Sequence, residues 1–432
     1  MSSSEIRTTF LIRSLWTRNT ITLILGLTLI SLLTLSSCTE DKWAIDVSDV
    51  TLPTDFSVRN FHREIQYLSE SDSSSLIQLR SNYNLFLTDY CENILKIGSS
   101  QSIETIDKIR GFVAHPDTKE THLAIDSTSG NAEFLRKVSL DLENGFKRLH
   151  VFMPDEIIPE VIWMNSGFNF AIYPRDEFVA VGLEWFLGPE HPILKLLPPD
   201  RFPKYQQLRM HPDLMAADAM KGWMLVHFNL YPITSSKRRG RPVILNQMAK
   251  HPNKLQEGLF ASIMDHIKGV LQNTNSQRYI DQMDSLASES PEAEKLVNRI
   301  RPREKCIDDI LYWGKILWLL GKCMPEQYEH VLMDWTPEDL EWAKANETAI
   351  WLELQPANVL FETNRTVFHR WLTDGPFTKF GSIPQESPDR LGVWMGLKIV
   401  ESFMEQNPET SAEQLFSEVD YIPFLKSYRP ER

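Results

Sequence analysis

Apolar side chains recur at every third or fourth position along much of this 432-residue chain, a spacing that places them on one face of an α-helix. Between Ser57 and Pro154 two such stripes stand out. Their members are Leu76, Leu79, Tyr83, Leu87 and Tyr90, and then Leu135, Val138, Leu142, Phe146 and Leu149. The pattern therefore predicts that the N-terminal half of the chain is helical.

A short β signal follows these helices. Residues 161–165, 168–173 and 178–182 are rich in β-branched and aromatic side chains, and the intervening Asn165-Ser166-Gly167 and Pro174-Arg175-Asp176 are typical of turns. The three runs predict a small antiparallel sheet. A further helix is expected to begin near Asp213.

The stretch from Asp309 to Met404 carries the clearest helical pattern, and the chain is organised around it. Its first stripe consists of Ile307, Ile310, Leu311, Gly314, Leu317 and Trp318, and its last of Val393, Gly396, Leu397, Val400, Phe403 and Met404. Gly321 is expected to end the first helix as a left-handed cap. In the last helix Gly392 and Gly396 lie one turn apart, which permits close backbone approach.

Between these two stripes, Thr336 marks the start of another helix. It precedes Pro337, Glu338 and Asp339, which combines a hydroxyl cap, a proline at the first helical position and acids near the positive helix end. The helix is expected to reach Leu354. Its apolar face consists of Leu340, Ala343, Ile350, Trp351 and Leu354, and this face also contains Glu347.

A carboxylate on an apolar face requires an explanation, because an isolated buried carboxylate is costly. We expect Glu347 to be buried and paired with Lys315, Arg370 or Arg390. The alternative is a carboxyl group of raised pKa in a cleft, acting as a general acid or base. Glu347 is therefore a weak catalytic candidate, and the structural pair is the favoured interpretation.

The N-terminus has a different pattern. Arg7, Arg13 and Arg18 precede an apolar run from Ile21 to Leu35 that ends at Cys38. At about 15 residues, this run is shorter than the roughly 20 that span a bilayer, so a lipoprotein signal is favoured over an uncleaved anchor. We predict a signal peptide over residues 1–37, lipid on Cys38 and a polar tether over 38–55. Residues 56–432 then form a single domain, helical over 56–155 and sheet plus helices over 156–432.

Composition describes a globular body of ordinary type, with 42% hydrophobic and 24% charged residues. The formal net charge is −13. Nucleic-acid binding is not expected, because it requires a basic surface. Besides Cys38 the chain contains Cys91, Cys306 and Cys323. The last two lie about 25 Å apart on one expected helix, so free buried thiols are the favoured interpretation and one disulfide is the alternative.

Four motifs in a fixed order resemble a known family. They are Tyr312-Trp313-Gly314-Lys315; Asn346-Glu347 with Ile350-Trp351; Pro376-Phe377-Thr378-Lys379-Phe380; and Ser387-Pro388 with Arg390, Gly392, Gly396, Ile399-Val400 and Met404. They resemble the YxGK, NExxIW, PFSKF and SPGxxGxxxGxxIVxxYM motifs of the gliding motility lipoprotein GldB family of Bacteroidota. Weaker similarities at residues 61–64 and 181–188 extend the resemblance to roughly residues 45–430.

The chain departs from the family pattern at three places. Asp389 replaces the glycine expected after Ser387-Pro388, the segment Met333-Asp334-Trp335-Thr336 differs from the family's xGYT, and Tyr231 to Pro252 resembles an insertion. These departures are typical of a divergent member or of a relative outside the gliding bacteria.

The resemblance implies an accessory lipoprotein of the gliding motility and type IX secretion machinery. Such a protein is anchored to a cell-envelope membrane by its N-terminal lipid, faces the periplasm or the cell surface, and binds protein partners in the envelope. The family is also distantly similar to gluzincin-type zinc peptidases. We therefore expect a mainly helical α+β fold, with a zincin-like scaffold that lacks metal ligands.

Zinc chemistry would require two histidines four residues apart on the helix after the sheet, with a glutamate between them. The segment Asp213 to Trp223 contains no histidine, and His115 and His122 are expected at the surface. The GxSxG, GxxxxGK[ST], GxGxxG and CxxC motifs are also missing from the sequence. We expect no metal, no cofactor and no catalysis; a zincin-like or carboxylate-dependent envelope hydrolase is the alternative.

Overall fold

The computed structural model describes residues 42–54, 56–69, 73–228, 288, 305–355, 357–418 and 420–430. The expected signal peptide, Cys38 and the insertion at 231–252 lie outside these residues. The chain divides into two compact units, residues 1–46 and 47–432, and the second is described below. Within the described residues, no helix has the length and apolar character needed to cross a membrane.

The sheet of this unit has four short strands in the order β1-β2-β4-β3. They are β1 (Val58–Asn60), β2 (Glu160–Met164), β3 (Ile172–Pro174) and β4 (Phe178–Gly182). Strands β1 and β4 both pair parallel with β2, and only β3 and β4 are antiparallel. The expected antiparallel pairing is therefore confirmed for β3 and β4 only, and the sheet as a whole is mixed: the chain forms the edge strand β3 first and then returns as β4, between β3 and β2.

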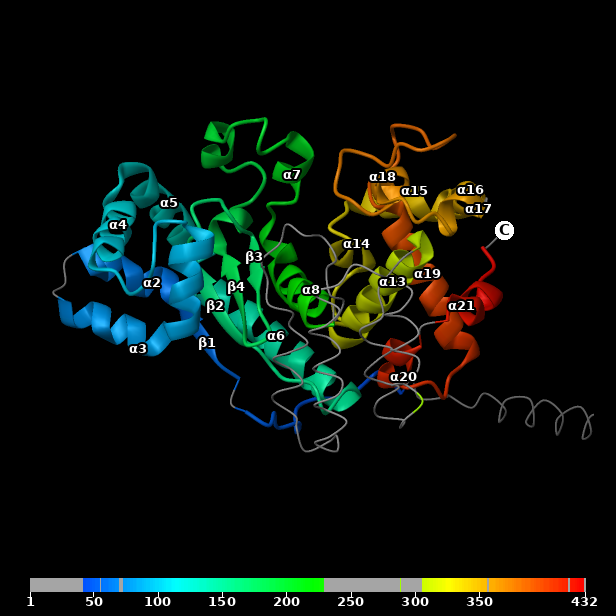
Figure 1. Cartoon of the computed structure of the whole chain (residues 1–432), viewed down its shortest axis with the longest axis horizontal. Helices are drawn as coiled ribbons and strands as arrows, with labels where there is room; N and C mark the ends of the chain where they lie inside the picture. Colours follow the sequence, from blue (N-terminus) through cyan, green and yellow to red (C-terminus); the bar gives the residue numbers. More distant parts are fainter. Residues whose placement is uncertain are drawn as a thin grey trace, which may run out of the picture. The chain divides into compact units, whose positions relative to one another are not determined.

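Most of the described secondary structure is helical, which confirms a mainly helical α+β fold (Figure 1). Between β1 and β2 come α2 (Phe61–Gln66), α3 (Ser73–Asp89), α4 (Ile103–Ala114), α5 (Pro116–Ser127) and α6 (Ala132–Phe152); after β4 come α7 (Lys204–Leu208) and α8 (Met215–His227). The C-terminal part contains α13 (Cys306–Cys323), α14 (Glu329–Leu332), α15 (Pro337–Ala345), α16 (Glu347–Leu354), α17 (Ala357–Leu360), α18 (Arg365–Phe368), α19 (Leu391–Gln406), α20 (Ala412–Ser417) and α21 (Tyr421–Ser427).

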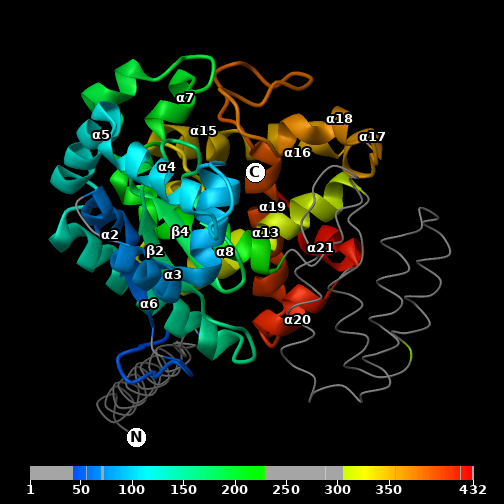
Figure 2. The ribbon, with the colours of Figure 1, turned by 60° about the vertical axis from the view of Figure 1, so that its left-hand side comes forward.

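The two faces of the sheet are covered by different helices (Figure 2). On one face Ile162, Met164, Phe178 and Ala180 join a buried cluster with aromatic side chains of α2 and α3, among them Phe61 and Phe86, whose rings meet edge to face at 4.9 Å. Successive strand residues point to opposite faces. The other face is left for α8, which packs on β3 and β4 and also contacts α6 and α13.

Helices α13 and α19 pack against each other and meet at Gly314 and Gly396. A Cβ atom added to Gly314 would overlap the carbonyl group of Gly396, and one added to Gly396 would overlap the carbonyl oxygen of Ile310. The prediction of close backbone approach in the last helix is confirmed, and Gly314 supplies the other side of the contact.

Two local predictions for the C-terminal helices were wrong. Gly321 does not cap α13, which continues to Cys323. The helix that starts after Thr336 has the expected hydroxyl cap, in which the Thr336 side chain accepts from the Asp339 N–H, but it breaks at Asn346, whose φ and ψ are −114° and 13°. Glu347 is consequently the first residue of a new helix, α16, rather than a position within a long one.

The three described cysteines are free and buried, as predicted. Burial raises the pKa of the Cys91 thiol to about 12, with a smaller contribution from Glu92. Burial likewise raises the thiol pKa of Cys306 and of Cys323. Because the thiolate is the reactive form, none of the three is suited to nucleophilic chemistry.

A buried ion network as the candidate functional site

Helix α8 occupies the position after the sheet where a zinc peptidase would be expected to carry its metal ligands. It presents Lys221, whose side chain is only 9% exposed. The ammonium group lies 2.9 Å from Asp218 Oδ1, pairs with Asp334 Oδ1 and donates a hydrogen bond to the carbonyl oxygen of Leu332 at 3.1 Å. The side chains of one lysine and two aspartates thus contact one another below the surface.

The contacts continue from Asp334 to the start of α19. Asp334 Oδ2 lies 3.0 Å from Arg390 Nη1, and Arg390 Nε lies 3.2 Å from Asp374 Oδ1 and 3.3 Å from Asp389 Oδ1. Asp389 in turn lies 2.7 Å from Arg209 Nη2. We call Asp218, Lys221, Asp334, Arg390, Asp389, Arg209 and Asp374 the ion network.

Asp389 is the best-satisfied carboxylate of the ion network. Its side chain is 1% exposed, and besides the two arginines it accepts hydrogen bonds from Trp335 Nε1 at 3.1 Å and from the Gly375 backbone N–H at 2.9 Å. A buried carboxylate needs this number of partners to offset the loss of hydration. The ion network therefore ties α8, the turn after α14, the segment before α19 and the end of α7 together.

The backbone at two members of the ion network is unusual. Asp334 and Arg390 have φ values of 54° and 53°, in the left-handed region that non-glycine residues rarely adopt. Such a conformation costs of order 1–3 kcal/mol and persists only where the surroundings hold it. Here the strained residues are the two that contact each other, so their ion pair is one of the interactions that hold both turns.

The charges of the ion network set the pKa values of its carboxyl groups. Burial alone would raise the pKa of Asp334, but Lys221 and Arg390 outweigh it and hold that pKa below its ordinary value. Burial, followed by the negative charge of Asp334, raises the pKa of Asp218 well above its ordinary range in spite of Lys221. The pKa values of the two carboxyl groups beside this ammonium group are thus shifted in opposite directions.

The two clearest departures from the family pattern, Asp334 and Asp389, are both members of the ion network. Sequence reasoning noted them only as departures. Their roles were missed because their partners lie far away along the chain, at Lys221, Arg209 and Arg390, and no local spacing signals such contacts.

Glu347 is buried, as predicted, with an exposed fraction of 8%. The expected cationic partners were wrong: Glu347 Oε1 accepts a hydrogen bond from the Tyr428 hydroxyl at 2.6 Å. Lys315 instead donates to the carbonyl oxygen of Glu418, and Arg390 belongs to the ion network. The partner was missed because it lies 81 residues away in the last few residues of the chain.

We expect Tyr428→Phe to destabilise the fold by about 1–3 kcal/mol, because it removes the hydrogen-bond donor from a buried carboxyl group. Glu347→Gln should cost less, since the amide oxygen still accepts from Tyr428. Chemical denaturation measures both. The control is Tyr328→Phe, at a residue whose exposed fraction is 73%, and a loss there equal to that of Tyr428→Phe would contradict the argument.

Other residues of the family motifs pack around the start of α19. Thr378, between Phe377 and Lys379, donates its N–H to the carbonyl oxygen of Pro388 at 3.0 Å, and Ser387 donates its hydroxyl to the carbonyl oxygen of Thr378 at 3.2 Å. Gly392 leaves no room for a Cβ against the backbone of Trp371, whose ring lies 5.3 Å from that of Phe380. The PFTKF segment beginning at Pro376 is thus held against the start of the last long helix. Trp351, from the Asn346-Glu347 motif, packs edge-on against Tyr428 at 4.9 Å.

Lys315, also a family-motif residue, lies on α13 and packs against α21. Its ammonium is 5.1 Å from the ring centroid of Phe424. Burial lowers the pKa of Lys315 to about 8, although the charges of Glu418 and Asp308 oppose the shift. The residues of the four family motifs therefore connect α13, α16, α19 and the C-terminal segment through packing and hydrogen bonds. These contacts stabilise the fold.

One histidine prediction was wrong. His122 is buried rather than at the surface, and its Nδ1 lies 3.1 Å from Nδ1 of His62, which is fully buried. His62 Nε2 lies 3.1 Å from Asp126 Oδ1. Burial lowers the pKa of both rings, that of His122 to about 4. Burial thus favours the neutral form of both rings, and their contact joins α2 to α5.

A second buried histidine ends α8. His227 Nδ1 lies 3.0 Å from Asp176 Oδ1 and Nε2 lies 2.8 Å from Glu156 Oε2, while the ring stacks on Trp223 at 4.2 Å. Burial would lower the pKa of His227, but the two carboxylates outweigh it and raise the pKa above its ordinary value. A carboxylate at each nitrogen favours the charged form of the ring, in which both nitrogens donate.

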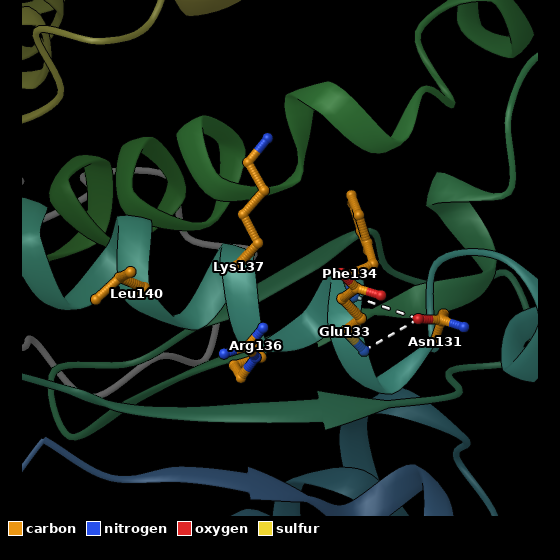
Figure 3. Close-up of a pocket in the computed structure, with 6 residues that line it drawn as sticks. All are labelled: Asn131, Glu133, Phe134, Arg136, Lys137 and Leu140. Carbon is orange, nitrogen blue, oxygen red and sulfur yellow. Dashed lines mark hydrogen bonds between the residues drawn. The ribbon is translucent and has the colours of Figure 1, made fainter.

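A surface hollow of about 550 Å³ lies over the first turns of α6 (Figure 3). Its lining residues are Asn131, Glu133, Phe134, Arg136, Lys137 and Leu140. Asn131 caps the helix by accepting from the N–H groups of Glu133 and Phe134. All six come from one exposed helical stretch of mixed charge, and they do not combine into a catalytic arrangement.

Among the residues that the structure describes, no group of three or more histidine, cysteine, aspartate or glutamate side chains is placed to hold a metal ion. The expectation that the protein binds no zinc is a separate matter and stays a prediction.

Comparison with known protein families gives a match over most of the chain. No curated protein and no solved structure matches the chain, so the zincin-like scaffold also stays a prediction. The family described as gliding motility protein GldB matches residues 40–252 and 272–430. This match covers most of the chain, including the ion network and all four motifs, and the protein therefore belongs to the gliding motility protein GldB family.

Proposed function

We propose that the protein is an accessory lipoprotein of the gliding motility and type IX secretion machinery, anchored in a cell-envelope membrane through Cys38, and that it works by binding other proteins rather than by catalysis. The ion network is the observation that supports a binding role rather than catalysis. Where a hydrolase helix would offer side chains to a substrate or a metal, α8 offers an ammonium group that two aspartates already surround.

The chemistry of the ion network favours a structural role. An acid, base or nucleophile must reach its substrate, whereas the side chains of Lys221, Arg390 and Asp389 are 9%, 8% and 1% exposed. Only Asp374, at 67%, is largely exposed among the ion-network residues. Each buried cation contacts at least two carboxyl groups of the protein. These cations are therefore already paired and do not offer a free charge to a substrate.

Family membership supports the first half of the proposal, the link to gliding motility. The N-terminal sequence supports the anchor, because the cationic start and the short apolar run place Cys38 where a lipoprotein signal ends. The alternative is an envelope hydrolase of zincin-like or carboxylate-dependent type. It would gain support from stoichiometric zinc together with measurable peptide or glycan hydrolysis.

We expect Cys38→Ala to abolish lipid labelling and to release the protein from membranes washed with alkaline carbonate. The matched control is Cys91→Ala, which removes a buried thiol of the folded body and should leave labelling intact. If the Cys38→Ala protein is still labelled and still bound to the membrane, the apolar run is an anchor and the lipoprotein assignment is wrong.

The binding role is tested by crosslinking in intact cells, followed by purification from native membranes. We expect envelope proteins to be recovered in fixed proportion with the wild-type chain, and gliding and secretion to fail when the gene is deleted. Recovery of the chain alone, with one zinc per chain and hydrolytic turnover, would overturn the proposal in favour of the hydrolase.

A further inference from the structure

Two carboxyl groups of the ion network compete for one ammonium group. Asp218 and Lys221 are one helical turn apart on α8, and Asp334 approaches the same ammonium from the turn after α14. Arg390 contacts Asp334, and none of its described ion pairs involves Asp218. Asp218 is therefore the carboxyl group of this inner cluster with the least compensation.

A hydrogen bond between the two acids requires a proton. Asp218 and Asp334 contact the same ammonium group, which brings their carboxyl groups close together, and two ionised carboxylates cannot hydrogen-bond because neither has a donor. Asp334 already accepts from both Lys221 and Arg390, so its negative charge is the better stabilised. The proton consequently belongs on Asp218.

The structure assigns a shared proton to the Asp218–Asp334 pair: Asp218 is a neutral acid that donates to ionised Asp334, and this proton latches α8 to the turn after α14 and, through Arg390, to the start of α19. The groups that face the pair are Lys221 on α8, Arg390 at the start of α19, and behind them Asp389, Asp374 and Arg209. Loss of the proton adds a second negative charge beside Lys221 and loosens the latch.

The pH dependence follows from linkage. The directions of the two pKa shifts agree with the geometry, since that of Asp218 is raised and that of Asp334 is lowered. A carboxyl group that stays protonated in the fold contributes stability that is present below its ordinary pKa of 3.8 and declines as pH rises toward the folded value. This one group changes the unfolding equilibrium constant by up to about tenfold per pH unit.

The test is a comparison of Asp218→Asn with Asp334→Asn in the full chain, solubilised in detergent. An asparagine at 218 imitates the neutral acid and still donates to Asp334. We expect Asp218→Asn to be at least as stable as wild type at pH 7 and to lose less stability between pH 5 and pH 9. Asp334→Asn leaves Lys221 and Arg390 without their shared anion and should raise the unfolding equilibrium constant by on the order of a hundredfold. Equal destabilisation by the two variants, or an unchanged pH profile in Asp218→Asn, would overturn the assignment.

A spectroscopic measurement keeps the test independent of how well Asp334→Asn folds. Infrared spectra of the wild-type chain near pH 7 should contain the carbonyl stretch of a protonated carboxyl group that Asp218→Asn lacks. The matched control is Asp374→Asn, at the exposed carboxylate of the same ion network, which should leave that band unchanged. If the spectra of wild type and Asp218→Asn coincide in this region, Asp218 is ionised and the latch does not exist.

Discussion

Replacing Gly396 by alanine is expected to unfold the protein. At the crossing of α13 and α19 the added Cβ would overlap the carbonyl oxygen of Ile310 and crowd the backbone N of Gly314. Backbone atoms of two packed helices cannot move aside as a flexible side chain can, so the helices must separate along their length. Because that separation exposes much of a tightly packed core, we expect a loss of several kcal/mol, seen as loss of the cooperative transition in thermal and chemical denaturation.

The chain offers a matched control for this substitution. Gly111 lies within α4, is exposed, and has nothing within 4 Å of the position that a Cβ would occupy. Alanine there should stabilise by up to about 1 kcal/mol, because alanine is the better helix former. The same chemical change thus has opposite signs at two helical glycines. A Gly396→Ala protein that unfolds at the wild-type midpoint would show that the two helices do not cross where they are placed.

Arg390→Met should be the most destabilising single substitution in the ion network. It removes one buried cation from three aspartates and keeps the length of the side chain, so the loss of charge dominates over the loss of volume. Breaking a buried pair by removing one partner costs about 3–5 kcal/mol, since the remaining charge is left without compensation. Equilibrium unfolding near pH 7 measures this loss.

The comparison for Arg390→Met is Arg110→Met on α4. Arg110 pairs at 3.3 Å with Asp107, whose side chain is 71% exposed. Surface pairs of this type contribute about 0–1 kcal/mol, so little change is expected. If Arg390→Met were as mild as Arg110→Met, the buried groups would have to be solvated or neutral, and the ion network could not hold the start of α19 in place.

Several features of the fold were predictable from local sequence. Thr336 forms the expected hydroxyl cap, and the apolar stripes of α6, α13 and α19 are buried as their period indicated. Such features follow from residues three or four positions apart, because these are neighbours in any helix. The order of the four motifs likewise indicated the family, and the family match confirms it.

The strand pairing shows where local reasoning fails. Strand β1 comes about a hundred residues before its partner β2, and Val58 lies opposite Val161. A run of three residues has no periodicity that could announce it. Parallel pairing is decided by how the intervening helices cover the sheet, a property of the assembled body rather than of either strand.

The candidate site was also decided by tertiary structure. Glu347 required a partner, and that much follows from its place on an apolar face, but Tyr428 was selected by the position of the chain end against α16. The break at Asn346 and the pairing of His62 with His122 have the same origin. Sequence by itself determined the apolar faces of α6, α13 and α19, the hydroxyl cap at Thr336, the close approach at Gly396 and the family, because these depend on neighbours within a turn or on ordered motifs. Only the tertiary structure brought Arg209, Lys221, Asp334 and Arg390 together, because the energy of buried charges depends on partners that no sequence spacing specifies.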